Sequence, residues 1–134
     1  MAAEGLISQK SNYEPKETVG RLESAVSRRG LTIFARVDHA AGAAEVNQPL
    51  RPTDLLIFGN AKGGTPVMQA AQTAGIDLPL KALVWQDANG ITWLSYNDPA
   101  WIAARHAASP DAKAAIEAMS KLLEGIAAEV ALEK

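Results

Sequence analysis

The sequence predicts one α+β domain with a largely antiparallel sheet and packed helices, in the order β-α-β-β-α-β-β-α-α. Apolar residues change between helical and alternating spacing several times along the chain. Two apolar strands flank Asp87-Ala88-Asn89-Gly90, which is typical of an antiparallel hairpin. The chain ends in a long amphipathic helical stripe. A doubly wound parallel sheet is the main alternative, and the lack of regular strand–helix alternation argues against it.

Length and composition limit the classes of protein. A chain of 134 residues suits a single domain over residues 1–134. The absence of cysteine excludes disulfides and thiolate chemistry. A formal charge of −2 gives no attraction for nucleic acid, and no uncharged apolar run approaches the length of a membrane span. We therefore expect no nucleic-acid or membrane partner, and a cytoplasmic protein unless a signal peptide has been removed.

The first third of the chain predicts a strand, a helix and a second strand. A short strand is expected near Leu6, followed by a helix that begins near Pro15 and stops at Gly30. Residues 31–38 alternate between apolar and polar, which predicts a strand with one face in solvent. Phe34 lies on the polar side of this alternation, so a helix or a partner subunit is expected to cover it.

The middle of the chain predicts a connection, a buried strand and a helix. The small residues at 40–45 could form a turn or two of helix, but Gly42 and the prolines at 49 and 52 favour a connection. The continuous apolar run at 55–58 predicts a strand that is buried on both faces. Thr65 is expected to cap the next helix, with Pro66 in its first turn and Gly75 after its end.

The last part of the chain predicts a hairpin and two helices. The hairpin strands are 78–85 and 91–96, with Pro79 at the start because proline cannot donate to a strand ladder. Asp98 is expected to cap a helix, and the longest helix is predicted from residue 110 to about residue 132. The low share of large side chains suggests that a homodimer shares burial between two copies.

Several motifs occur in a characteristic order. They are Val37-Asp38-His39-Ala40-Ala41-Gly42, Leu55-Leu56-Ile57-Phe58-Gly59-Asn60, Gly64-Thr65-Pro66, Asp77-Leu78-Pro79-Leu80-Lys81 and Tyr96-Asn97-Asp98-Pro99. Together they resemble the domain-of-unknown-function 302 family. The resemblance implies an antiparallel α+β fold and a dimer, and it implies no reaction. Ala61 departs from the family, which commonly has proline after the Gly-Asn pair, so the chain is expected to be less constrained there.

Lys62-Gly63-Gly64-Thr65 is the leading candidate site. Glycines let the backbone approach a ligand, while a helix start and a lysine favour an anion. The lysine precedes the glycines, unlike the lysine of a nucleotide P-loop. The alternative is a tight strand-to-helix turn with Lys62 in solvent. We expect a small anionic ligand here, and no metal or cofactor.

Five other residues are candidates at strand ends and inside one strand. His39 has acid–base or metal-ligand chemistry and Asp38 could orient its ring, although adjacent strand residues point to opposite faces. The alternative, which the pattern favours, is a capping or surface histidine. Lys81 lies in an apolar strand, where it either faces a cleft as a base or nucleophile or protects a sheet edge. Tyr96 and Asn97 end a strand and could line a pocket.

Three functional hypotheses follow. The first is a binding domain for a small anion at Lys62–Thr65, with Asp38, His39, Lys81, Tyr96 and Asn97 nearby. The second is a small acid–base enzyme that uses His39 or Lys81, which requires these groups to share one cavity. The third is a structural or interaction protein that forms a homodimer.

Overall fold

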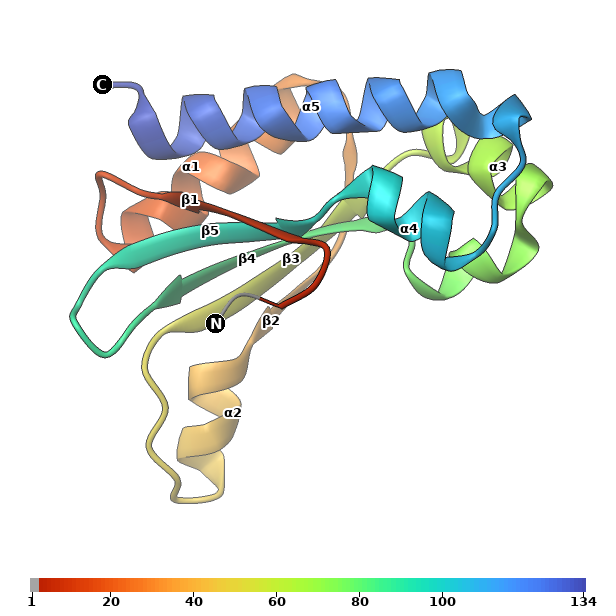
Figure 1. The fold of residues 1–134 in the computed structure, drawn as a ribbon. Helices are drawn as coiled ribbons and strands as arrows, with labels where there is room; N and C mark the ends of the chain where they lie inside the picture. Colours follow the sequence, from red (N-terminus) through yellow and green to blue (C-terminus); the bar gives the residue numbers. More distant parts are fainter. Residues whose placement is uncertain (1–2) are drawn as a thin grey trace.

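The computed structural model describes residues 3–134 as an antiparallel five-stranded sheet with its main helices on one face (Figure 1). The strand order is β1-β5-β4-β3-β2. The strands are β1 (Leu6–Lys10), β2 (Thr32–Asp38), β3 (Thr53–Gly59), β4 (Leu80–Gln86) and β5 (Thr92–Asn97). The helices are α1 (Pro15–Arg28), α2 (His39–Glu45), α3 (Ala61–Ala70), α4 (Pro99–Arg105) and α5 (Lys113–Leu132), with short 3-10 turns η1 (Gln72–Ile76) and η2 (Pro110–Ala112). The predicted fold class is confirmed.

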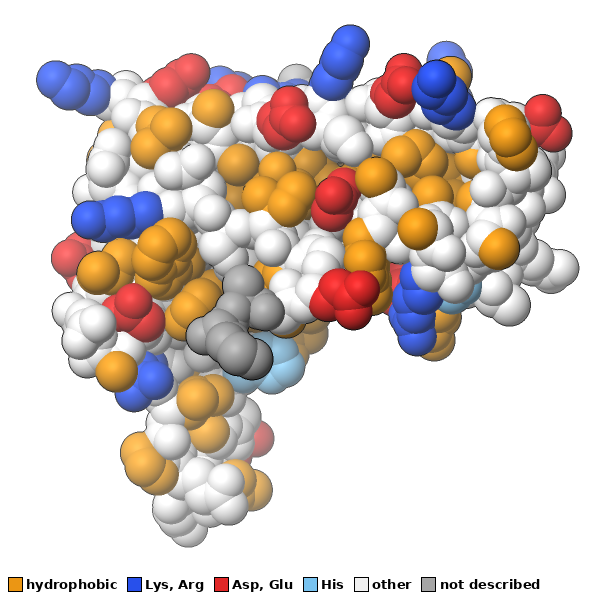
Figure 2. All heavy atoms as spheres, in the orientation of Figure 1, with side chains coloured by type: hydrophobic (Ala, Val, Ile, Leu, Met, Phe, Trp, Pro, Cys, Tyr) orange, Lys and Arg blue, Asp and Glu red, His pale blue; other side chains and the backbone are white. Residues whose placement is uncertain are grey.

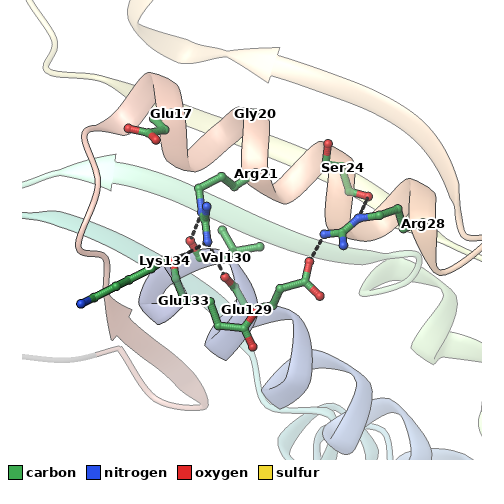
Figure 3. Close-up of a pocket in the computed structure, with 9 residues that line it drawn as sticks. All are labelled: Glu17, Gly20, Arg21, Ser24, Arg28, Glu129, Val130, Glu133 and Lys134. Carbon is green, nitrogen blue, oxygen red and sulfur yellow. Dashed lines mark hydrogen bonds and ion pairs between the residues drawn. The ribbon is translucent and has the colours of Figure 1, made fainter.

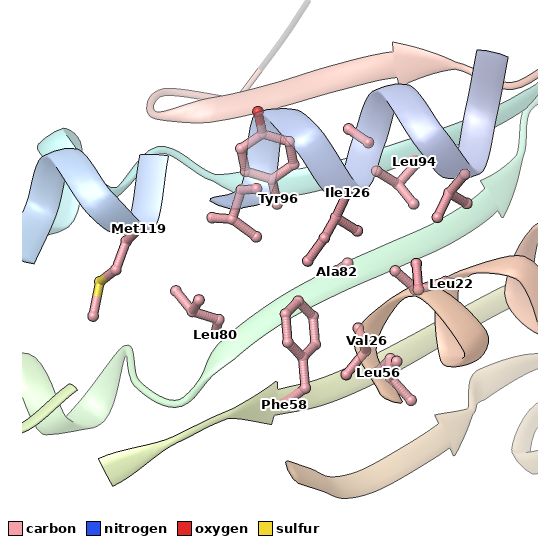
Figure 4. Packing of buried hydrophobic residues seen from close by; sticks show 14 of the residues in the cluster. Leu22, Val26, Leu56, Phe58, Leu80, Ala82, Leu94, Tyr96, Met119 and Ile126 are labelled. Atoms are coloured by element: carbon pink, nitrogen blue, oxygen red, sulfur yellow. The ribbon is translucent and has the colours of Figure 1, made fainter. Parts of the chain in front are cut away.

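The hydrophobic core lies between the sheet and the helices α1 and α5. Leu56 and Phe58 of β3 point into it, where Leu22 of α1 and Ile126 of α5 meet them (Figure 4). The intervening residues of β3 are only partly buried, because they belong to the other face of the sheet, which carries no long helix. The prediction that this strand is buried on both faces is therefore wrong.

The edge strand β2 and the helix α2 lie outside this core. All seven residues of β2 are exposed. Phe34 lies at an irregularity in the β2–β3 register and is 55% exposed. The helix that was expected to cover Phe34 is therefore not found within the described chain. The predicted connection after it is instead the helix α2, which projects from the sheet and buries none of its residues (Figure 1). Asp38 caps α2 by accepting from the amide of Ala41 at 2.9 Å, and alanine propensity outweighs the cost of Gly42.

The helix α3 begins five residues earlier than predicted. Its N-cap is Asn60, and the predicted cap Thr65 and the proline Pro66 lie inside the helix. Asn60 has extended backbone geometry, and its Oδ1 accepts from the amide of Gly63 at 2.6 Å. That cap outweighs the low helix propensity of the two glycines that follow. The candidate segment 62–65 is therefore the first helical turn and not a loop.

The C-terminal predictions are confirmed at the hairpin and both helices. Gly90 adopts φ +80° in the turn, and its amide donates to the carbonyl of Asp87 at 3.0 Å. Asp98 caps α4 by accepting from the amide of Ala100 at 3.0 Å. The helix α5 follows η2 and runs for 20 residues across the sheet. Within residues 3–134, no helix has the length and apolar character needed to cross a membrane.

Candidate functional site

A cavity of about 800 Å³ lies where α3, the segment before β4 and the first half of α5 meet. Its walls are mainly apolar, and they include Met68 of α3, Leu78 and Met119 of α5. The whole of the predicted segment Lys62–Thr65 lines the same cavity. Its volume lies within the range of small-molecule sites, which are mostly apolar with few polar groups.

The first turn of α3 lines this cavity and contains the first backbone amides of the helix. Asn60 satisfies the amide of Gly63, whereas the amides of Ala61 and Lys62 donate no hydrogen bond to any residue from 3 to 134. A Cβ at Gly63 would lie 3.1 Å from Oδ1 of Asn60, so a side chain there would press on the cap. A Cβ at Gly64 would meet only ordinary contacts, the nearest at 3.7 Å. Gly63 therefore supports the cap, whereas a side-chain carbon at Gly64 would fit without displacing a neighbour.

Of residues 3–134, two cationic side chains and no carboxylate line the cavity. Arg29 donates to the carboxylate of Glu129 at 3.0 Å and to the carbonyl of Ala25 at 3.1 Å, so its charge is already paired. Lys62 is exposed and forms no ion pair with any described residue. The cavity therefore has one uncompensated positive charge at its rim, beside the free amides of α3.

Three of the other predicted residues lie elsewhere. Asp38 caps α2, and His39 is the first residue of that exposed helix. Tyr96 is 5% exposed and packs in the core between the sheet and α5 (Figure 4). Burial, with smaller contributions from the carboxylates of Glu124 and Asp98, raises the pKa of Tyr96. None of the three lines the cavity.

Lys81 and Asn97 lie on the opposite face of the sheet from the core. Lys81 pairs with Ile57 in the register of β3 and β4, and its Nζ donates to the carbonyls of Asp77 and Pro79, each at 3.0 Å. Burial lowers the pKa of Lys81, against the charge of Asp77. These two hydrogen bonds hold the segment before β4 in place. Because His39, Lys81 and Lys62 share no cavity, the geometry gives no support to the acid–base enzyme.

Sequence reasoning missed a polar cluster that joins η1 to α4. The carboxylate of Asp77 accepts from Arg105 at 2.8 Å and from Nε2 of His106 at 2.6 Å, and Nδ1 of His106 lies 2.8 Å from the hydroxyl of Thr73. Burial by itself raises the pKa of Asp77, but the hydrogen bonds from His106 and Arg105 outweigh it and lower that pKa. The residues lie outside the cavity and hold two elements together. Asp77 occurs in a family motif, whereas its partners are spaced too far along the sequence to be recognised.

A second, polar hollow of about 610 Å³ lies between α1 and α5 (Figure 3). Arg21 donates to the carbonyls of Glu129, Val130 and Glu133 at 2.7–2.8 Å, and Arg28 pairs with Glu129. Arginine thus satisfies the free carbonyls at the end of α5. The donors of Arg21 are taken up by these carbonyls and Arg28 is paired with Glu129, so both arginines hold α1 against α5. Among residues 3–134, no three His, Asp or Glu side chains gather as a metal site.

Comparison with known proteins gives a family, three curated relatives and a structural neighbour. The model of the family "Domain of unknown function DUF302" matches residues 7–126. "Fluoride-specific ion channel FluC 1" of Brucella suis is 45% identical over 115 residues, 86% of this chain and 45% of that protein. The protein of the same name in Brucella abortus is also 45% identical, over 43% of its length. The chain thus spans less than half of these relatives.

The structural neighbour supports the fold. The crystal structure of an uncharacterised conserved DUF302 protein from Bacillus stearothermophilus superposes with a TM-score of 0.84. It covers 96% of this chain and 99% of that one, at 20% sequence identity. The two chains therefore share the whole arrangement of sheet and helices, and at this identity the likeness concerns the fold alone.

Proposed function

The chain belongs to the DUF302 family of domains of unknown function, and we propose that this member binds a small anionic molecule in the cavity beside the first turn of α3. One observation carries the proposal. The cavity of about 800 Å³ is lined by no carboxylate of residues 3–134, and Lys62 in its lining forms no ion pair with them, although the chain as a whole has a net charge of −2. A cationic lining in an acidic protein favours an anionic ligand.

The local geometry adds to this argument. The amides of Ala61 and Lys62 are the first of the helix and are free to donate, and the helix dipole places partial positive charge there. Lys62 supplies a full charge on the same turn. The fluoride-channel relatives of this chain are named for a small anion, so fluoride is included among the ligands to be tested.

The test is a ligand screen by thermal shift and calorimetry. Fluoride, inorganic phosphate, acetate, larger carboxylates and nucleotides are titrated into the wild type, into Lys62→Gln and into the control Lys121→Gln, whose lysine is exposed on α5 and does not line the cavity. We expect one anion class to bind, with about two- to fivefold weaker affinity in Lys62→Gln only, as for a charge near a helix start. A screen in which no anion binds, or in which Lys62→Gln binds as well as the wild type, contradicts the proposal.

A second candidate function, assembly as a homodimer, is favoured by the apolar surface around the sheet edge. Val37 of β2 is 37% exposed, and Val46 and Leu50 beyond α2 are 62% and 50% exposed. β2 is also an edge strand whose outer backbone groups are unpaired within the described chain. A second copy related by a two-fold axis presents the same strand edge and the same apolar side chains. It would therefore pair the outer backbone groups of β2 and cover the apolar side chains in one interface.

A further inference from the structure

We propose that the anion taken by this cavity carries an apolar tail, so that the ligand class is a monocarboxylate with an alkyl or aryl body. The inference rests on the proposed function and specifies its ligand. The tail lies between α3 and α5, and the carboxylate faces the first turn of α3.

The walls of the cavity explain the tail. Away from the first turn of α3 they include Met68, Leu78, Leu80, Met119 and Leu122. The charged side chain in that part of the described lining is Arg29, which is paired with Glu129. Leu80 and Met119 are each 7% exposed, so the floor of the cavity is continuous with the hydrophobic core (Figure 4). A ligand that was only an inorganic anion would leave this apolar surface in water. An apolar body removes it from water, and this is favourable in proportion to the area buried.

Small residues on α5 leave space in the cavity for the apolar tail. Ala114, Ala115 and Ala118 lie on the side of the helix that faces the cavity, within little more than one turn. Larger side chains at these positions would fill the space between α5 and α3. The two methionines have flexible side chains that adapt to different apolar shapes. The space therefore suits a chain or ring of variable outline.

The charged side chains that line the cavity indicate which anionic group the ligand carries. Arg29 is paired with Glu129, which leaves Lys62 as the unpaired cation of the lining. One positive charge with two nearby amides matches a single carboxylate, whose two oxygens accept hydrogen bonds. A dianion such as a phosphate monoester would bring a second negative charge with no partner.

The experiment is calorimetric titration of the wild-type protein with hexanoate, octanoate and decanoate, each below its critical micelle concentration. Acetate and inorganic phosphate serve as anions without a tail, and decyltrimethylammonium as a tail with the opposite charge. Two tryptophan variants complete the set. Ala118→Trp fills the cavity, while Ala128→Trp places the same side chain on α5 outside it; both alanines are exposed, so both variants are expected to fold. Ala114→Phe is the second filling variant should Ala118→Trp fail to fold.

Affinity is expected to rise by up to about fourfold for each methylene added. Decanoate binding should be lost in Ala118→Trp and kept in Ala128→Trp, and decyltrimethylammonium should not bind. Acetate or phosphate binding as tightly as decanoate, with dependence on Lys62, would overturn this inference and leave the proposed function standing. Decanoate binding that survives Ala118→Trp and Ala114→Phe, or that the cationic tail equals, would also overturn it. If no anion binds at all, the proposed function fails as well.

Discussion

Single residues such as Asn60 and Asp77 hold elements in place through one side chain. Asn60 begins α3 at residue 61 because its Oδ1 reaches the amide of Gly63. Asp77 links η1 to α4 because Arg105 and His106 both donate to its carboxylate. The side chain of Asp77 is only 14% exposed, so these bonds are screened less than those of a surface pair.

Asp77→Asn is predicted to reduce the free energy of unfolding at neutral pH by about 1–3 kcal/mol, the usual contribution of hydrogen bonds to a charged group. The pKa of Asp77 in the folded protein lies below its unfolded value of 3.8. The carboxylate therefore contributes its full stability above that value and loses it as the pH falls through the lower folded pKa.

The measurement is urea unfolding of the wild type and Asp77→Asn at neutral pH and at a series of acidic pH values. The difference in free energy of unfolding between the two proteins should decrease toward zero as the pH falls below 3.8. Glu117→Gln, which removes an exposed carboxylate of α5 that has no hydrogen-bond partner in the described chain, is the control and should show little difference throughout. A difference between Asp77→Asn and wild type that stays constant into strong acid would contradict the assignment.

Among the elements, α3 forms a helix although several of its residues have low helix propensity. Its first six residues include Gly63, Gly64 and Pro66, the residue types with the lowest helix propensity. Pro66 has no amide to donate to the carbonyl of Lys62, and it lines the cavity. The helix is kept by its cap and by Val67, which is fully buried in the core.

Pro66→Ala is predicted to raise the free energy of unfolding by about 1–3 kcal/mol, because alanine restores the amide donor and removes the ring from the helix interior. The matched control is Pro110→Ala, at the first position of η2, where no amide is needed and no gain is expected. Chemical denaturation measures both variants. Destabilisation by Pro66→Ala would mean that packing of the ring in the cavity wall exceeds its cost to the helix.

The whole molecule is asymmetric about its sheet, and this asymmetry leads to the dimer proposal. Core side chains occupy the face under α1 and α5, while β2 and α2 extend beyond the helical layer (Figure 1). Figure 2 shows hydrophobic side chains spread over the projecting α2 region. A seven-residue helix that buries nothing has little tertiary packing to stabilise it, and short isolated helices are marginal in water. In the proposed dimer, a second copy would supply the missing packing.

Sedimentation velocity at micromolar concentration is predicted to give a dimer for the wild type and a monomer for the double variant Val37→Glu/Val46→Glu. The added carboxylates would be buried without partners in the interface. Ile76→Glu is the control, because Ile76 is 73% exposed and lies on η1, away from β2 and α2. A monomeric wild type, or a dimer that survives the double variant, would rule out this interface.

The amino-acid sequence by itself determined the fold class, the hairpin and the long last helix. Those features depend on periodicity and turn chemistry within short segments, as in the alternation around Asp87–Gly90. It also marked the segment 62–65 as a candidate by its glycines and lysine. The start of α3 was predicted wrongly, and a connection was preferred to α2, because a cap at Asn60 or Asp38 competes with glycine and proline signals of similar strength nearby.

Only the tertiary structure decided which of the predicted site residues come together. It placed Lys62–Thr65 on an apolar cavity and sent Lys81 to the other face of the sheet, Tyr96 into the core and His39 onto α2. It also revealed the contact of Asp77 with His106, which are 29 residues apart. The physical reason is that a cavity forms between elements distant in sequence, so its walls and charges depend on strand register and helix packing that no short segment encodes.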